Sequence, residues 1–201
     1  MVEDRRVRKT KNAIKQAFIK LLAEKELERI TIQDITTLAD INRGTFYLHY
    51  EDKYILLSDL EDEFIDDLAE EIGTFKLVLQ GSNLEDFAKI FSEKILKNII
   101  LHIQKDIDFY LLIFKLDRKS HLEDKISELI YVNMAKNINN KTKISGIPLD
   151  YFHSYVSGAT ISFIKHWVQD KNRMDPDVVV DYLFKIIFNG PLRLMANEQY
   201  Q

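Results

Sequence analysis

The chain has 201 residues, of which 46% are hydrophobic and 30% charged, a composition typical of a folded globular protein and not of a disordered one. It has no cysteine, which excludes disulfides and thiolate chemistry, and only six glycines and three prolines, which favours helices over a many-stranded sheet. The net charge of −4 is uneven, because residues 1–53 hold eleven Lys and Arg against nine Asp and Glu and the remainder is acidic.

The charged N-terminal residues are not followed by a continuous apolar run. No window of the chain approaches the roughly 20 apolar residues that span a membrane. We therefore expect no signal peptide, no membrane segment and a cytoplasmic location.

The first predicted helix covers residues 6–24, with apolar side chains at helical spacing along one face. Between Arg5 and Ala23 the chain carries seven basic residues and no acidic one. Such a run favours a polyanionic partner, but it is equally typical of a solvated helix face.

Residues 31–50 predict two short helices joined by a tight turn. Thr31 and Asp34 have the spacing of a capping box at the start of the first helix, and Asn42 is a good N-cap for the second. On the second helix Phe46 and Tyr50 are four residues apart and share a face. The other face carries Arg43, Gly44, Thr45, Tyr47 and His49.

The remaining predicted helices cover residues 52–72, 82–103, 108–115, 120–139, 148–170 and 175–189. A strand is the alternative for 108–115 because that apolar run is short. Gly190 and Pro191 are expected to stop or break the last helix. The fold class is therefore all-α with about nine helices. The change from a basic to an acidic composition predicts a domain boundary near residue 53, with a basic N-terminal domain at 1–53 and a larger acidic helical domain at 54–201.

Motifs for enzymes are absent from the sequence: there is no GxxxxGK[ST], GxGxxG, GxSxG or HExxH. The five histidines fall in five different predicted elements without short ligand spacing. We expect no catalytic site, no metal and no cofactor.

The arrangement of residues 31–50 is that of a helix-turn-helix, in which the second helix presents donors to a DNA groove. The run TIQDITTLADINRGTFYLHYEDKYILL resembles the DNA-binding module of the TetR family of bacterial transcriptional regulators. The residues that match the family pattern are Thr31, Ile35, Ala39, Gly44, Thr45, Tyr47, His49, Lys53 and Leu56 or Leu57.

The resemblance implies which residues contact DNA. Phosphates would be bound by Thr31, Thr45, Tyr47, His49 and Lys53. Arg43 and the backbone of Gly44 would reach the major groove, while Phe46 and Tyr50 would pack inside the module. Lys53 could instead pair with Asp52 or Glu51, although a lysine in the first turn of a helix is disfavoured by the helix dipole, which favours an anionic partner.

The chain departs from the family pattern in the turn and after the histidine. Asp40 stands where the family has glycine, so an aspartate is expected at a position of positive φ. Tyr50 stands where the family has phenylalanine, and its hydroxyl must reach solvent or a partner. Leu48 falls where some members have a second phosphate-binding aromatic residue.

The resemblance also implies a small apolar effector bound in the C-terminal domain and a homodimer formed by helices at about 148–170 and 175–189. The candidate effector residues are Phe91, Ile95, Tyr110, Phe114, His153, Tyr155 and Trp167. An aromatic stripe at helical spacing is also typical of an ordinary core. The C-terminal segment has a weaker resemblance to the subgroup that includes activators of dihydroxyacetone kinase, through Gly158, Trp167 and Pro176.

The sequence thus predicts a homodimeric, cytoplasmic transcriptional repressor that binds a near-palindromic operator in double-stranded DNA. A basic segment from Arg5 to Lys11 would add backbone or minor-groove contacts. The alternatives are an activator of the same fold, or a helical protein-interaction module without DNA binding.

Overall fold

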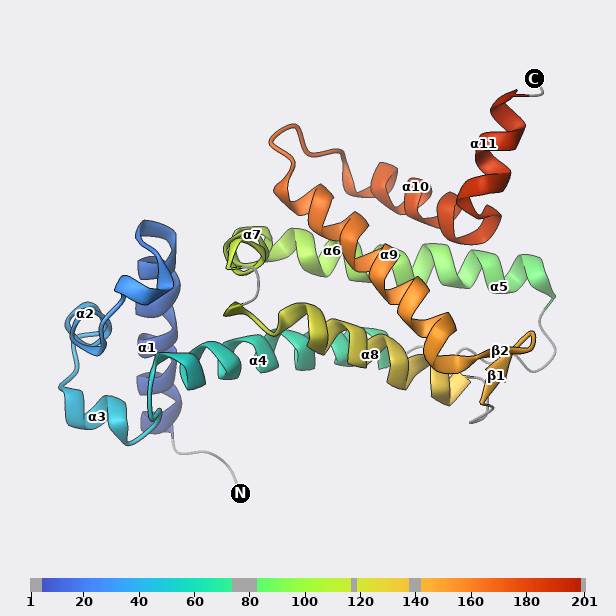
Figure 1. Ribbon diagram of the computed structural model, residues 1–201. Helices are drawn as coiled ribbons and strands as arrows, with labels where there is room; N and C mark the ends of the chain where they lie inside the picture. Colours follow the sequence, from blue (N-terminus) through green and yellow to red (C-terminus); the bar gives the residue numbers. More distant parts are fainter. Residues whose placement is uncertain (1–4, 74–82, 117–118, 138–141, 200–201) are drawn as a thin grey trace. The chain divides into compact units, whose positions relative to one another are not determined.

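The computed structural model describes residues 5–73, 83–116, 119–137 and 142–199, and these are almost entirely helical (Figure 1). The N-terminal helices are α1 (Arg5–Glu24), the 3₁₀ turn η1 (Leu27–Arg29), α2 (Ile32–Leu38), α3 (Arg43–Tyr47) and α4 (Lys53–Gly73). They are followed by α5 (Leu84–Ile90), the π-helical η2 (Phe91–Leu96), α6 (Lys97–Lys105), α7 (Ile107–Lys115) and α8 (Leu122–Asn137). The last elements are β1 (Lys143–Ile144), β2 (Ile147–Pro148), α9 (Leu149–Gln169), α10 (Pro176–Asn189) and α11 (Pro191–Gln199).

The all-α prediction is confirmed, and the differences lie at element boundaries. The helix predicted at 82–103 is the continuous run of α5, η2 and α6, and α7 is a helix, not the alternative strand. Asn83 accepts a hydrogen bond from the Asp86 amide at 2.8 Å, and Ser82, where the helix was predicted to begin, lies outside the described residues. α11 was not predicted, because Gly190 and Pro191 ended the pattern.

The chain divides into two compact units. The first comprises Met1–Phe64 with Leu112–His121, and the second Ile65–Leu111 with Leu122–Gln201. The N-terminal helices of the first unit, in blue and cyan in Figure 1, pack against one another. Buried side chains of these helices include Ile14, Phe18, Ile35, Phe46, Leu56 and Leu60. The predicted division at residue 53 stays a prediction.

A buried carboxylate lies in the first unit. Glu61 of α4 is only 1% exposed, and it accepts hydrogen bonds from the Ser120 hydroxyl at 2.7 Å and the His121 amide at 3.2 Å. A buried carboxylate needs such donors because it has lost its hydration. The Ser120 side chain therefore links the segment before α8 to α4.

In the second unit α8 packs against α9, and α10 packs against α6, η2 and α9. A short antiparallel pair, β1 with β2, precedes α9, with Ser145 and Gly146 at positive φ in its turn. Pro148 occupies the N-cap of α9. Asp175 caps α10, with Pro176 in its first turn.

Large apolar side chains of α9 and α10 point into solvent. On α9, Tyr151 is 71% and Tyr155 65% exposed. On α10, Val178, Tyr182 and Ile186 are spaced by four residues and are 38%, 45% and 37% exposed. We call these two sets the apolar stripes. None of the helices in the described ranges is long and apolar enough to span a bilayer.

Candidate nucleic-acid interface

The start of α2 is fixed by a reciprocal cap. The Thr31 hydroxyl accepts from the Asp34 amide at 3.1 Å, and an Asp34 carboxylate oxygen accepts from the Thr31 amide at 2.8 Å. Lys25 of the α1–η1 segment adds an ion pair to the same oxygen at 2.7 Å. The hydrogen bond from Lys25, followed by those from Thr31, lowers the pKa of the Asp34 carboxyl to about 2. The predicted capping box is confirmed.

The turn between α2 and α3 has the backbone expected from the sequence. Asp40 has a φ of 54°, in the left-handed region that the family fills with glycine. Asn42 then caps α3 by accepting from the Thr45 amide at 2.8 Å. The Thr45 hydroxyl donates to the same Asn42 oxygen at 3.0 Å, so its own oxygen is still able to accept.

The inward face of α3 and the residues after it close the core of the first unit. Phe46 is fully buried and Tyr50 is 3% exposed. The Tyr50 hydroxyl donates to Asp59 of α4 at 2.8 Å, which answers the sequence question of where this hydroxyl goes. Lys15 of α1 is ion-paired with Asp59 at 2.8 Å and with Glu63 at 2.7 Å. Although burial alone would lower the pKa of Lys15, the hydrogen bonds and charges of these two carboxylates outweigh it and raise the pKa.

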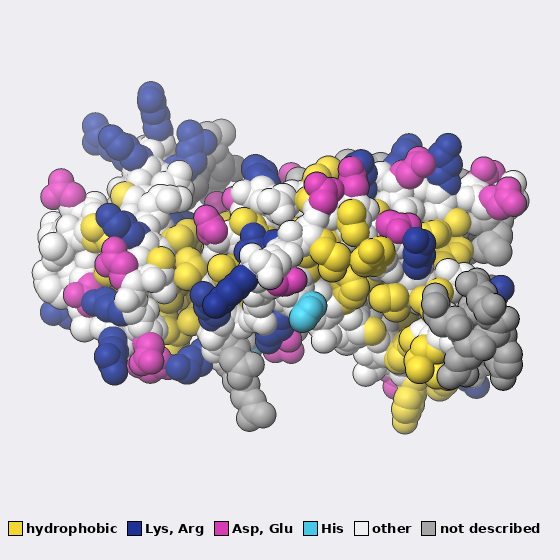
Figure 2. Space-filling view, turned by 90° about the horizontal axis from the view of Figure 1, so that it is seen from above, with side chains coloured by type: hydrophobic (Ala, Val, Ile, Leu, Met, Phe, Trp, Pro, Cys, Tyr) yellow, Lys and Arg dark blue, Asp and Glu magenta, His cyan; other side chains and the backbone are white. Residues whose placement is uncertain are grey.

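The outward face of α3 carries donors and an aromatic ring in solvent. Arg43 donates to the Tyr47 hydroxyl at 3.2 Å, and its guanidinium carbon lies 5.8 Å from the Tyr47 ring centre. Tyr47 is 49% exposed, and its ring is held edge-on against Phe46. We call Arg43, Gly44, Thr45, Tyr47 and His49 the recognition face. Figure 2 shows Lys and Arg side chains projecting from the surface over α1 to α3, with acidic side chains between them.

Gly44 and Leu48 flank this face differently. A Cβ on Gly44 would come within 3.3 Å of the Asn42 side-chain oxygen, so a larger residue would crowd the cap of α3. Leu48 is 82% exposed and brings no polar group to the surface. Leu48 therefore does not contribute to the core.

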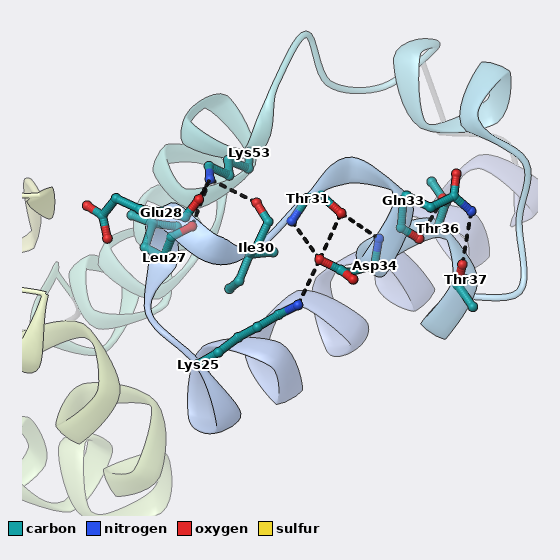
Figure 3. A network of polar contacts seen from close by, with 10 residues as sticks. All are labelled: Lys25, Leu27, Glu28, Ile30, Thr31, Gln33, Asp34, Thr36, Thr37 and Lys53. Atoms are coloured by element: carbon teal, nitrogen blue, oxygen red, sulfur yellow. Dashed lines mark hydrogen bonds and ion pairs between the residues drawn. The ribbon is translucent and has the colours of Figure 1, made fainter.

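Lys53 has partners that the sequence did not suggest. Its ammonium donates to the carbonyl oxygens of Leu27 at 2.8 Å, Glu28 at 2.9 Å and Ile30 at 2.8 Å (Figure 3). The helix dipole argument had favoured an anionic partner for Lys53, but in the structure its ammonium contacts three backbone carbonyl oxygens instead. The contact of Lys53 with phosphate stays a prediction, and it competes with these three hydrogen bonds.

The basic N-terminal run is helical. Arg5 to Lys11 form the first turns of α1 and not an extended arm. Arg5, Arg6, Arg8 and Lys9 are exposed there. The predicted backbone or minor-groove contact of this segment stays a prediction.

The predicted effector residues do not share one environment. Ile95, Tyr110, Phe114 and Trp167 are buried, whereas Tyr155 is 65% exposed. Phe114 belongs to the first unit and the others to the second. Phe91 packs near Phe188 of α10, with ring centres 6.4 Å apart, and Trp167 donates to the Met174 carbonyl at 2.9 Å.

An open hollow of about 350 Å³ lies between α8 and α9. It is lined by Glu123, Asp124, Ser127, Ser157, Gly158, Ile161, Ser162 and Lys165, none of which the sequence suggested. His153 lies beside it: Nε2 is 2.8 Å from the Ser127 carbonyl oxygen, so this nitrogen carries the proton. The small residues of α8 and α9 are far apart in sequence, which is why no local motif reveals the hollow. Among the described residues no cluster of His, Asp or Glu has the geometry of a metal site.

Comparison with known proteins gives two kinds of match. Residues 92–189 match a family model described as a transcriptional regulator C-terminal region. Two curated relatives come from Bacillus subtilis and are named as uncharacterized HTH-type transcriptional regulators. YxbF is 35% identical over 60 residues, 30% of this chain, and YerO is 25% identical over 191 residues, 94% of this chain. The matched parts of this chain span 15% and 60% of the lengths of these relatives.

Solved structures share the fold along nearly the whole chain. A TetR transcriptional regulator from Streptococcus agalactiae is 25% identical, with a TM-score of 0.65, over 93% of this chain and 98% of that one. The dihydroxyacetone kinase operon activator DhaS is 19% identical, with a TM-score of 0.58, over 89% and 93% of the two chains. At 19% identity the likeness to DhaS concerns the fold alone.

Proposed function

Because this chain belongs to the TetR family of transcriptional regulators, we propose that it is a homodimeric repressor that binds a near-palindromic operator and is released by a small-molecule effector. The observation that carries DNA binding is the recognition face. It combines a capped helix N-terminus with Arg43 held by Tyr47, and both groups are exposed. A planar donor at the start of a recognition helix suits a base edge in the major groove.

The proposed contacts divide into two classes. Arg43 and the Gly44 backbone read bases, and Thr31, Thr45, Tyr47 and His49 bind phosphates. The two recognition helices of a dimer enter successive major grooves about 34–36 Å apart. Phosphate contacts release counterions, so affinity falls as salt rises.

DNA binding is tested by selecting duplexes from a random pool and titrating the selected duplex by fluorescence anisotropy at several salt concentrations. We expect a selected near-palindrome, with affinity for it at least about a thousandfold above that for a scrambled duplex. Absence of any salt-dependent affinity, together with a stoichiometric protein partner in purified material, would favour the protein-interaction alternative. A reporter gene behind the selected site separates repression from activation.

Homodimerisation is supported by the apolar stripes. Exposed aromatic and branched side chains at a spacing of four residues are typical of helices that pack against another subunit. The helices concerned, α9 and α10, are those predicted for the interface. Sedimentation equilibrium gives the oligomeric state, and a monomer at micromolar concentration would contradict this part of the proposal.

Effector binding is proposed for the second unit, at one of two places. The apolar candidates Ile95, Tyr110 and Trp167 lie in its core, while the hollow between α8 and α9 is open and polar. A hollow of about 350 Å³ is within the range of small-molecule sites. Thermal-shift screening with polar and apolar compounds distinguishes the two candidate places. If the effector binds in the hollow, Ser162→Phe abolishes the shift. If it binds in the core, the same variant leaves the shift intact.

A further inference from the structure

We propose that Lys53 is a positioning residue of the DNA-binding unit, which it serves by clamping the turn at residues 27–30 and not by pairing with a phosphate. This inference rests on the proposed DNA-binding function. It concerns how the recognition face is held, and it reassigns a residue that the resemblance places on DNA.

The first argument is the match of donors to acceptors. A lysine ammonium has three N–H donors and no acceptor. The three carbonyl oxygens at 2.8, 2.9 and 2.8 Å use all of them. A phosphate oxygen would have to replace at least one of these bonds.

The second argument is the location of the turn. Leu27 and Ile30 are each 1% exposed, so their side chains are fixed in the core. Leu27 is the first residue of η1 and Ile30 its C-cap, and helical carbonyls point toward the C-terminal end, where a cation is favoured by the local dipoles. The next residue is Thr31, the cap of α2. The clamp therefore ties the first turn of α4 to the origin of the helix-turn-helix (Figure 3).

A second lysine at the same turn provides the contrast. Lys119 pairs with the Glu28 carboxylate at 2.6 Å, but both side chains are about half exposed, at 52% and 46%. The hydrogen bond from Lys119 lowers the pKa of the Glu28 carboxyl. Exposed ion pairs of this kind are screened and contribute little. Lys53, by contrast, contacts backbone atoms, which no change of side chain at residues 27–30 removes.

The test compares three variants, Lys53→Met, Lys53→Arg and Lys119→Met, with Lys20→Met as a control for loss of one exposed charge on α1. Without DNA, we expect Lys53→Met and Lys53→Arg to lower the melting temperature by about 5 °C and to speed amide hydrogen exchange at residues 27–31. The planar fork of arginine does not reproduce three convergent bonds. Lys119→Met and Lys20→Met should leave exchange at these residues unchanged.

With DNA, Lys53→Met should weaken binding about five- to tenfold at every salt concentration without changing the salt slope, because preorganisation is lost and no counterion is involved. A phosphate contact would give the opposite pattern: the slope would fall by about 1, arginine would restore affinity, and the stability of the free protein would not change. That pattern overturns the clamp and leaves the proposed function intact. If wild type and Lys20→Met bind no duplex, the proposed function fails, while the exchange data still decide the clamp.

Wild-type protein supplies a measurement that does not depend on variants folding. Limited labelling with an amine-reactive reagent, read by mass spectrometry, should modify Lys53 at least about tenfold more slowly than Lys20, because three hydrogen bonds must open first. Equal rates would overturn the proposal.

Discussion

Two surfaces of the chain carry large side chains in solvent: the recognition face of α3 in the first unit and the apolar stripes of α9 and α10 in the second. The recognition face presents a guanidinium and hydroxyls on a short helix that is capped by Asn42, with His49 just after the end of that helix. The stripes present tyrosine rings and branched aliphatic groups without a local cation cluster. Exposure is therefore common to both, while their chemistry selects a polyanion for one and an apolar partner for the other.

The difference has a consequence for salt. Binding by the recognition face should weaken steeply with ionic strength, whereas association through the stripes should be nearly indifferent to it. Polar contacts differ between the two regions. In the first unit, caps and an ion pair hold residues 25–34. In the second unit, α10 packs against α6 and α9, and Lys97 of α6 pairs with Asp177 of α10 at 2.8 Å.

The largest effect is expected from Tyr182→Glu, which places a charge in the α10 stripe. Burial of that charge at a subunit interface should cost about 3 kcal/mol, roughly a hundredfold in dimer affinity. Sedimentation equilibrium measures the loss. Tyr54→Glu is the matched control, because Tyr54 is 51% exposed on α4 and lies outside the stripes. If the Tyr182→Glu variant is as dimeric as wild type, the α10 stripe is not part of the dimer interface.

The next effect is expected from Arg43→Ala. Loss of a base-reading donor should cut discrimination between the selected and a scrambled duplex by about 1–3 kcal/mol. Arg29→Ala is the control, because Arg29 is 77% exposed in η1 and belongs to no part of the recognition face. Equal losses in the two variants would mean that Arg43 contributes only charge.

A smaller effect that depends on pH is expected from Asp34→Asn. The pKa of Asp34 is lowered to about 2 from 3.8, so its carboxylate stabilises the fold above about pH 4 and this contribution fades as the pH falls through 2. The wild type should therefore exceed the variant in stability at pH 6 and converge with it near pH 2. Far-UV circular dichroism follows this convergence. Fluorescence of Trp167, the single tryptophan, reports the second unit and should not distinguish the two proteins.

The smallest effect is expected from Asp40→Gly. Glycine adopts a φ of 54° without the steric cost that a Cβ imposes, so the variant should be more stable by about 0.5 kcal/mol, with DNA affinity unchanged. Ser145→Gly makes the same backbone change in the second unit, where Ser145 has a φ of 49°. Destabilisation by Asp40→Gly alone would indicate that the Asp40 side chain has a role of its own in the turn.

The parts of the fold that could be predicted are those set by residues close in sequence. The Thr31–Asp34 cap and the Asn42 cap each act over three residues. Phe46 and Tyr50, four residues apart, are both buried as predicted, although Tyr50 lies beyond the end of α3. Asp40 was recognised because only a few residue types tolerate its backbone conformation.

Contacts between residues that are distant in sequence were not predicted. Lys53 meets a turn 23 to 26 residues earlier, and Ser120 meets Glu61 across 59 residues. No spacing rule brings such residues together. The effector residues were chosen as apolar or aromatic, but the same types fill the core, as Trp167 does, or lie in solvent, as Tyr155 does.

The hydroxyl of Tyr50 also bears on how relatives of this chain can vary. A phenylalanine at that position needs no acceptor, whereas Tyr50 requires Asp59, and Asp59 in turn shares Lys15 with Glu63. The Tyr50 hydroxyl therefore couples the residue types at positions 15, 50 and 59. Among homologues, tyrosine at position 50 should occur together with an acidic residue at position 59, and homologues with phenylalanine at position 50 should have more varied residues at position 59.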